Sequence, residues 1–91
     1  MYVIISYDIT SSKRRTKVMK FLMDYGTRVQ KSVFECFINE EQFFYIKKTI
    51  KTLINHRKDR VRYWEICNSC ASKVEILGWG EIKEDDTFSI I

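Results

Sequence analysis

The sequence predicts one α+β domain, in which an antiparallel sheet carries two helices on one side. With 91 residues the chain is long enough for one ordinary domain and too short for two. Short apolar segments with the composition of strands are interspersed with two segments that carry a helical apolar stripe. Proline is absent and glycine occurs only 3 times, which favours regular structure with short connections.

The first strand and the first helix follow directly from residues 2–26. Residues Tyr2–Tyr7 are mostly β-branched or aromatic, which predicts a central strand covered on both faces. Ser11 or Ser12 can cap a helix that runs from about Lys13 to Tyr25. Its apolar stripe consists of Val18, Phe21, Leu22 and Tyr25. Gly26 then stands where a left-handed C-terminal cap is expected.

Alternation continues in the segment from Arg28 to Ile38, which predicts a single strand with apolar residues on both faces of its later part. Asn39 or Glu40 can start a second helix, which ends near residues 55–57. The buried stripe of that helix consists of Phe43, Ile46, Ile50, Leu53 and Ile54.

Three further short segments have strand composition: Val61–Cys67, Lys73–Leu77 and Thr87–Ile91. The first four strands and two helices predict a ferredoxin-like βαββαβ sandwich with an extra C-terminal strand. An apolar strand on a polar spacer suits addition to a sheet edge, so residues 87–91 are expected to dock on a partner.

Dimerisation is expected from the size and architecture of the domain. A chain this short buries only about two thirds of its unfolded surface. A ferredoxin-like sheet has helices on one face and leaves the other face bare. We therefore expect a homodimer whose contact lies on the bare face.

Charge is distributed unevenly along the chain. Residues 1–60 hold 13 Lys and Arg against 6 Asp and Glu, a balance of +7, and residues 61–91 have a balance of −3. A basic body suggests a polyanion such as nucleic acid as partner. A solvated surface without a partner is the alternative that charge alone leaves open.

The apolar runs, the start of the sequence and the cysteine content all favour a cytoplasmic location. No apolar run approaches the roughly 18 residues that a membrane span needs, and the start lacks the pattern of a signal peptide. A cytoplasmic location with no membrane partner and reduced thiols is expected. Cys67 and Cys70 have the spacing of half a zinc site, but small core or turn residues are the favoured interpretation.

Asp8 is the first candidate for chemistry. It directly follows the first strand and is the only carboxylate before Asp24. A carboxylate at a strand end can hold Mg²⁺, which prefers oxygen ligands. Two-fold symmetry would bring a second Asp8 to the same ion. The alternative is a helix cap or an ion pair with Arg14 or Arg15.

Basic and polar residues near Asp8 are candidate phosphate contacts. Arginine has a planar fork that suits phosphate. The candidates are Arg14, Arg15, Lys17, Arg28 and Ser32. The alternative interpretation of these basic residues is a solvated helix face. Tyr7 and Phe34 are expected near the site as structural residues, with core or interface packing favoured for Phe34.

Other chemical signals are weak. The aromatic residues Tyr63, Trp64 and Trp79 could stack on bases, but core packing is the safer interpretation for strand positions. His56 is the only histidine, and its basic surroundings do not favour acid–base catalysis. No glycine-rich phosphate loop, HExxH motif or nucleophile elbow is present.

Several motifs together resemble the Cas-two family of small CRISPR-associated proteins. The motifs are Tyr7-Asp8-Ile9 after an apolar strand, the basic pair Arg14-Arg15, the run Gly26–Phe34 (GTRVQKSVF), the stretch Asp59–Tyr63 (DRVRY), Ile66-Cys67 and Gly78. They span nearly the whole chain in the expected order. The aspartate together with the G-x-R-V-Q-x-S-V-F run makes the resemblance fairly specific.

The resemblance implies a ferredoxin-like homodimer in which Asp8 of both chains faces the two-fold axis and can bind Mg²⁺. It also implies that Arg15, Arg28, Ser32 and Phe34 lie near that site. The position of Lys17 is often basic in the family, and lysine there loses the bidentate geometry of arginine.

Two activities follow from the resemblance. The family is described as metal-dependent endonucleases that act on RNA or double-stranded DNA. It also partners the Cas-one integrase when new spacers are inserted into a CRISPR array, and the last strand would dock on the partner subunit or the integrase. The adaptor role in spacer acquisition is the favoured function in the cell, with nuclease activity expected of the isolated protein. A stand-alone, toxin-like endoribonuclease is the alternative.

Overall fold

The computed structural model describes residues 1–66 and 72–78. Its elements are β1 (Tyr2–Asp8), α1 (Ser12–Leu22), β2 (Gly26–Gln30), β3 (Val33–Phe37), α2 (Glu40–Leu53), β4 (Arg60–Ile66) and β5 (Ser72–Gly78). Cys67, Cys70, Trp79 and the strand expected at 87–91 lie outside the described residues. Within these described ranges, neither helix has the length and apolar character that a bilayer span requires.

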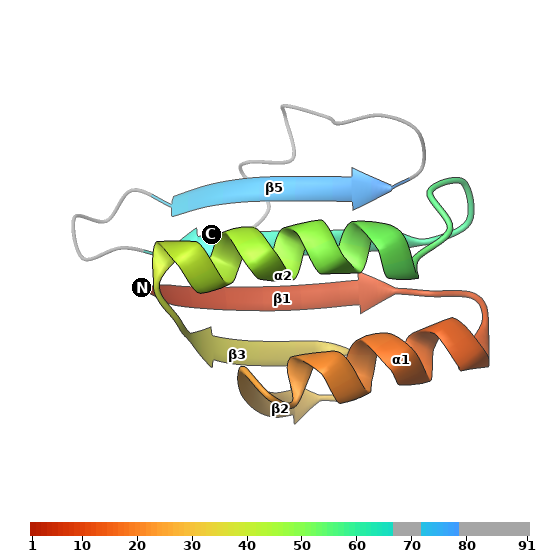
Figure 1. The fold of residues 1–91 in the computed structure, drawn as a ribbon, viewed down its shortest axis with the longest axis horizontal. Coiled ribbons are helices and arrows are strands. Elements are labelled where there is room, and N and C mark those ends of the chain that lie inside the picture. Colours follow the sequence, from red (N-terminus) through yellow and green to blue (C-terminus); the bar gives the residue numbers. More distant parts are fainter. Residues whose placement is uncertain (67–71, 79–91) are drawn as a thin grey trace.

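The five strands form one antiparallel sheet in the order β2-β3-β1-β4-β5. Figure 1 shows both helices on the same side of this sheet. The first six elements have the ferredoxin-like arrangement, and β5 is added at the β4 edge. The predicted fold class is confirmed. Within the described part of the chain, no helix covers the second face of the sheet.

The core lies between the sheet and the helices, and β1 is its central strand. Val3, Ile5 and Tyr7 point into the core and are at most 3% exposed. Their neighbours Ile4 and Ser6 face the other side and are only half-buried. The central position of this strand is therefore as predicted, but full burial is found on the helix side alone. The helices add Val18, Leu22, Phe43, Ile46 and Ile50 to the core.

Polar caps set the first residue of each helix. The Ser11 hydroxyl accepts a hydrogen bond from the Arg14 backbone N–H at 3.3 Å. Asn39 and Gln42 form a reciprocal capping box at the start of α2. Both starts agree with the prediction, whereas the helices end earlier than predicted, at Leu22 and Leu53.

The prediction of one strand from Arg28 to Ile38 is wrong. The segment is a hairpin, in which β2 and β3 pair with a register shift between Arg28 and Gln30. Lys31 and Ser32 form the turn, which contains neither glycine nor proline. Alternation of apolar and polar residues continues through this turn, so periodicity alone gave no sign of it. The Arg28 Nε donates a hydrogen bond to the Lys31 carbonyl at 3.1 Å and supports the turn.

Gly26 does not cap α1. The helix ends with Met23 in the ordinary right-handed conformation, and Gly26 is the first residue of β2, opposite Cys36. A Cβ atom at this position would collide with the Glu35 carbonyl oxygen and lie 2.5 Å from the Cys36 Sγ. Glycine is required here for close approach of the hairpin strands, not for a left-handed turn.

We expect Gly26→Ala to destabilise the domain by about 1–3 kcal/mol. The added methyl group would push the Glu35 backbone and the buried Cys36 side chain away from β2. Urea unfolding followed by circular dichroism measures the change. Thr27→Ala, at the exposed neighbouring position, is the matched control. Equal stability of Gly26→Ala and the wild type would contradict the close approach.

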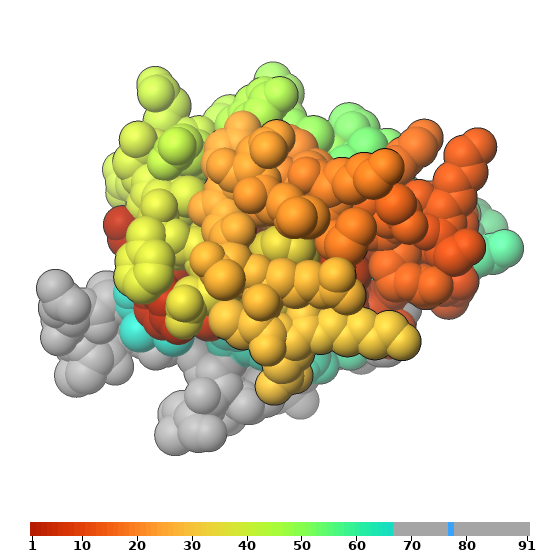
Figure 2. Space-filling model, turned by 90° about the horizontal axis from the view of Figure 1, so that it is seen from below, coloured from red at the N-terminus to blue at the C-terminus, as the bar shows by residue number. Residues whose placement is uncertain are grey.

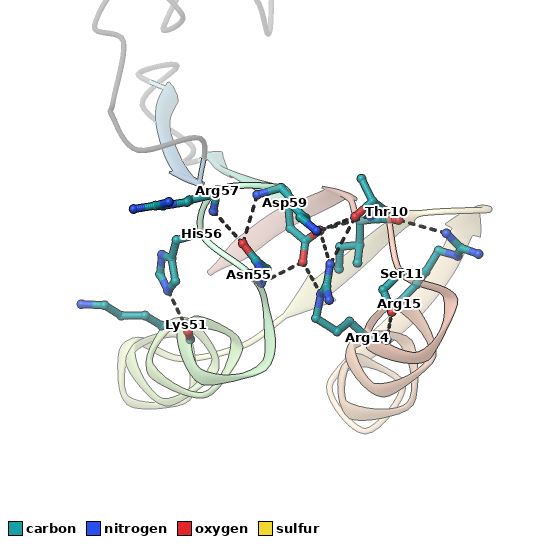
Figure 3. A network of polar contacts seen from close by, with 11 residues as sticks. Thr10, Ser11, Arg14, Arg15, Lys51, Asn55, His56, Arg57 and Asp59 are labelled. Carbon is teal, nitrogen blue, oxygen red and sulfur yellow. Dashed lines mark hydrogen bonds and ion pairs between the residues drawn. The ribbon is translucent and has the colours of Figure 1, made fainter.

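A buried carboxylate connects the start of α1 to the segment that follows α2. Asp59, 0% exposed, lies in the loop between α2 and β4. Its carboxylate accepts hydrogen bonds from the Arg14 guanidinium at 2.7 and 3.1 Å. The backbone N–H groups of Thr10 and Asn55 also donate to it, at 3.1 and 2.8 Å. Figure 3 shows how this carboxylate joins the β1–α1 loop to the α2–β4 loop.

The protonation of Asp59 reflects these contacts. Burial by itself would raise its pKa, but the hydrogen bonds from Arg14 and from the Asn55 and Thr10 backbones outweigh it and lower the pKa to about 2. The ionised form is therefore favoured in the folded state. A lowered pKa gives stability that is present above the ordinary value of 3.8 and is lost as the pH falls toward 2.

We expect Asp59→Asn to lower the free energy of unfolding by about 3 kcal/mol at neutral pH, because Arg14 loses its charged partner in a buried site. The difference from the wild type should shrink as the pH falls from 4 toward 2. Urea titrations at fixed protein concentration and several pH values measure this. Asp24→Asn, at an exposed position, serves as the control. A difference that stays constant with pH would contradict the assignment.

Candidate functional site

Asp8 is the last residue of β1 and is exposed. Side chains alternate along a strand, so the buried Tyr7 faces the helices and Asp8 faces the opposite side of the sheet. Antiparallel pairing with β4 places Asp8 directly opposite Arg60. The carboxylate therefore stands at the edge of the face that no described helix covers.

The surface around Asp8 is a shallow hollow of about 210 Å³ lined by Ser6, Asp8, Arg60 and Arg62. Arg60 and Arg62 lie on the same face of β4, two residues apart, beside β1. The hollow thus combines one carboxylate with two guanidinium groups, which can neutralise and orient a phosphate. Sequence reasoning missed both arginines, because their position beside Asp8 depends on a strand pairing that no local pattern encodes.

One protomer does not supply a complete cation site at Asp8. Among the described residues, no three His, Cys, Asp or Glu side chains gather closely enough to hold a metal ion. The two arginines beside Asp8 disfavour a cation held by a single carboxylate. Mg²⁺ often binds through one or two carboxylates and keeps several waters, so a second Asp8 would make the donor set adequate.

The ion pair considered for Asp8 is formed by a different carboxylate. Arg14 binds Asp59 rather than Asp8, with Nε 2.7 Å from Oδ2. Arg15 donates from Nη1 to the Ile9 carbonyl at 2.9 Å. The alternative interpretation of Asp8 as a partner of Arg14 or Arg15 is therefore wrong. A phosphate contact by Arg14 stays a prediction. The guanidinium of Arg14 already binds Asp59.

Two of the remaining predicted phosphate contacts, Arg15 and Arg28, lie on the helix side of the sheet. Arg15 and Arg28 line a second cavity, of about 150 Å³, together with Tyr7, Thr16, Met19 and Lys31. This cavity and Asp8 are separated by the sheet, since Tyr7 and Asp8 point to opposite faces. Lys17 is exposed on α1 and lines neither cavity.

Ser32 and Phe34 support this end of the sheet. The Ser32 carbonyl accepts a hydrogen bond from the Tyr7 backbone N–H at 3.0 Å. Phe34 is 0% exposed, and its ring stacks on that of Tyr7 with 6.3 Å between the centroids. The favoured interpretation of Phe34 as a core residue is confirmed. Contact of Ser32 with phosphate stays a prediction.

The other candidates divide between core and surface. Tyr63 is buried and packs edge-on against Phe43. Trp64 is half-buried on the other face of β4, and its indole N–H has no hydrogen-bond partner within the described residues. His56 is exposed, with Nε2 3.0 Å from the Lys51 carbonyl oxygen. Cys36 is a buried free thiol, and burial raises its pKa to about 11, which makes it a poor nucleophile.

Comparison with known proteins agrees with the motifs in the sequence. The model of the family described as CRISPR associated protein Cas2 matches residues 1–74. The chain is 40% identical over 81 residues to the CRISPR-associated endoribonuclease Cas2 1 of Chloroflexus aurantiacus, covering 88% of this chain and 87% of that protein. It is also 40% identical over 83 residues to the CRISPR-associated endonuclease Cas2 of Halalkalibacterium halodurans, covering 86% of each.

Solved structures show the same similarity in three dimensions. The crystal structure of Streptococcus pyogenes Cas2 at pH 6.5 matches with a TM-score of 0.69 and 35% identity, covering 74% of this chain and 87% of that one. A hypothetical protein from Thermus thermophilus matches with a TM-score of 0.70 and 32% identity, covering 91% of this chain and 96% of that one.

Proposed function

The chain belongs to the CRISPR associated protein Cas2 family, and on that premise we propose that it binds nucleic acid as a homodimer and cleaves phosphodiester bonds in RNA or double-stranded DNA. The names of the relatives, endoribonuclease and endonuclease, support this class of reaction. The observation that carries the proposal is the position of Asp8. It is exposed on the sheet face without a described helix, in a hollow that it shares with Arg60 and Arg62.

A second copy of the chain completes this site. In an interface with two-fold symmetry, the same residue approaches from both sides. Asp8 of both copies would then hold one Mg²⁺ ion. When bound, the ion would polarise a phosphoryl oxygen and lower the pKa of a bound water. The arginines of the hollow would hold the phosphate against this position and offset its negative charge.

Apolar residues on the same sheet face favour its burial by a partner copy. Phe37 is 74% exposed, and its ring lies 4.9 Å from that of Tyr2. Ile4 is half-buried between them and Asp8 along the face. Covering such a patch removes apolar surface from water, which contributes roughly 25 cal/mol per Å².

We expect Asp8→Asn to reduce Mg²⁺-dependent cleavage at least a hundredfold, because a metal ion contributes several kcal/mol to catalysis and each 1.36 kcal/mol is a factor of ten. Cleavage of labelled RNA and of duplex DNA, with Mg²⁺ or with EDTA, measures the effect.

Asp24→Asn removes an exposed carboxylate elsewhere and should cleave like the wild type. Asp8→Asn that cuts as fast as the wild type would show that the mechanism is wrong. Small-angle scattering that finds only monomers at micromolar concentration would exclude the shared site.

We propose in addition that the homodimer acts in spacer acquisition, as an adaptor that bridges subunits of the CRISPR integrase. The specific observation in favour is charge, since residues 1–60 have a balance of +7. A basic surface binds duplex DNA through phosphates without regard to sequence. In this role the chain needs its basic residues and its C-terminal docking segment, but not the carboxylate of Asp8.

If the adaptor role is the important one in the cell, Asp8→Asn should preserve spacer acquisition and deletion of residues 87–91 should abolish it. Sequencing of a CRISPR array after growth with the integrase measures both. The reverse pattern would favour the nuclease role. Growth arrest upon expression, absent in Asp8→Asn, would favour the toxin-like endoribonuclease instead.

A further inference from the structure

The hollow around Asp8 contains more positive than negative charge. Asp8 is the one carboxylate among its described lining residues, whereas Arg60 and Arg62 each carry a guanidinium group. Arginine is not deprotonated in proteins, so both groups stay positive. The remaining described lining residue, Ser6, is uncharged. Each copy of the chain therefore has an excess of positive charge at the position proposed for Mg²⁺.

Strand pairing holds both arginines close to the carboxylate. Arg60 is the register partner of Asp8, and Arg62 is the partner of Ser6, two residues earlier on β1. Directly opposite residues on one face have Cβ atoms roughly 4.5–5.5 Å apart, and diagonal neighbours lie roughly 7–8 Å apart. Both arginines are half-buried, so water and salt screen their charges incompletely. A cation at Asp8 would meet their repulsion at short range.

Two other carboxylates lie on or beside these strands, but neither offsets the excess charge. Asp59 is buried, and its charge is matched by the guanidinium of Arg14. Glu35 lies on the same sheet face as Asp8, but its register partner is Ile4, four residues before Asp8. Four residues along a strand span roughly 13 Å, which exceeds the Debye length of about 8 Å at physiological ionic strength.

The hollow faces away from both helices and is open to a ligand. Figure 2 views the molecule from the edge formed by the β2–β3 hairpin, in gold, with α1, in orange, and α2, in yellow-green, along its upper side. The hollow lies on the other side of the sheet and has a volume of about 210 Å³. One water takes up about 30 Å³ of liquid, so the hollow can hold a phosphate group together with waters.

A phosphate group would change the charge of the hollow in favour of a cation. Mg²⁺ gives up its waters reluctantly and is usually bound by one or two carboxylates together with phosphates of the substrate. In the free protein, the guanidinium groups of Arg60 and Arg62 outnumber the carboxylate that would attract the ion. A phosphodiester adds negative charge and pairs with guanidinium groups through two oxygens at once. The carboxylate of Asp8 then remains available to the metal ion.

We propose that Arg60 and Arg62 prevent Mg²⁺ from binding at Asp8 until a phosphate of the nucleic acid has bound, so that metal ion and substrate bind cooperatively. The inference rests on the proposed function for the identity of the site and adds the order in which the site is filled. The two arginines act on the ion through their charge, without contact. The protein without nucleic acid is then a weak Mg²⁺ binder.

Titration of the ¹⁵N-labelled protein with Mg²⁺ at constant ionic strength, followed by NMR, tests the proposal on the wild type. The backbone amides of Asp8 and Arg60 report on the hollow. Their shifts should require at least about tenfold more Mg²⁺ in the free protein than in complexes with RNA or duplex DNA, since couplings between two ligands are typically 5–150-fold. Spectra are recorded within minutes of mixing, and the nucleic acid is checked for cleavage afterwards. Asp8→Asn should show no such shifts in either state.

Replacement of one arginine tests the source of the repulsion. Arg62→Gln removes one positive charge from the hollow and should raise the Mg²⁺ affinity of the free protein about tenfold. Arg62→Lys retains the charge and should behave like the wild type. Lys48→Gln is the matched control, because it removes the same charge from the exposed surface of α2, outside the hollow.

Equal Mg²⁺ affinity of the wild type with and without nucleic acid would overturn the proposal, and this comparison needs no variant that must fold. Arg62→Gln that folds and binds Mg²⁺ no better than the wild type or Lys48→Gln would overturn it as well. Tight binding of Mg²⁺ by the free protein would leave the proposed cleavage site intact and contradict only the order of binding. Asp8 amides that do not respond to Mg²⁺ even in the complex would overturn the shared cation site itself.

Discussion

The alternation of side chains along β1 governs where every candidate residue of this protein can act. Tyr7 and Asp8 are neighbours in the sequence, yet the pleat sends one toward the helices and the other to the opposite face. The register fixes this choice, because a shift by one residue would expose Val3, Ile5 and Tyr7 and bury the carboxylate. The hydrophobic core on one face thus keeps the carboxylate of Asp8 exposed on the other.

The hydrogen bonds to the Asp59 carboxylate hold the end of β1 in place. A buried carboxylate is costly unless it is fully hydrogen-bonded, and this one is satisfied by a guanidinium and two backbone N–H groups. Because one of these N–H groups belongs to Thr10, the chain just after Asp8 is fixed to the loop before β4. Arg60 follows Asp59 directly, so the same hydrogen bonds also position β4, the strand that places Arg60 and Arg62 beside Asp8.

Local patterns predicted those parts of the fold that depend on local physics. Ser11 and Asn39 begin their helices because their side chains satisfy backbone N–H groups within the same turn. The hairpin was missed because the turn at Lys31 has no special residue and alternation runs through it. The pairing of Asp8 with Arg60 connects residues 52 positions apart, and no periodicity along the chain reports such a contact. The exposed carboxylate was predicted, whereas its neighbours were not.

Separation of Asp8 from the cavity lined by Arg15 and Arg28 also bears on two opposing electrostatic demands. A site that holds a divalent cation needs negative charge, whereas a site that binds nucleic acid needs positive charge, and each weakens the other at short range in a low-dielectric environment. The sheet keeps Arg15, Arg28 and Lys31 on one side and the carboxylate on the other. Arg60 and Arg62 are the exception, and they lie where a phosphate would meet the ion. The sheet therefore separates the exposed carboxylate of Asp8 from three of the positive charges of this basic protein.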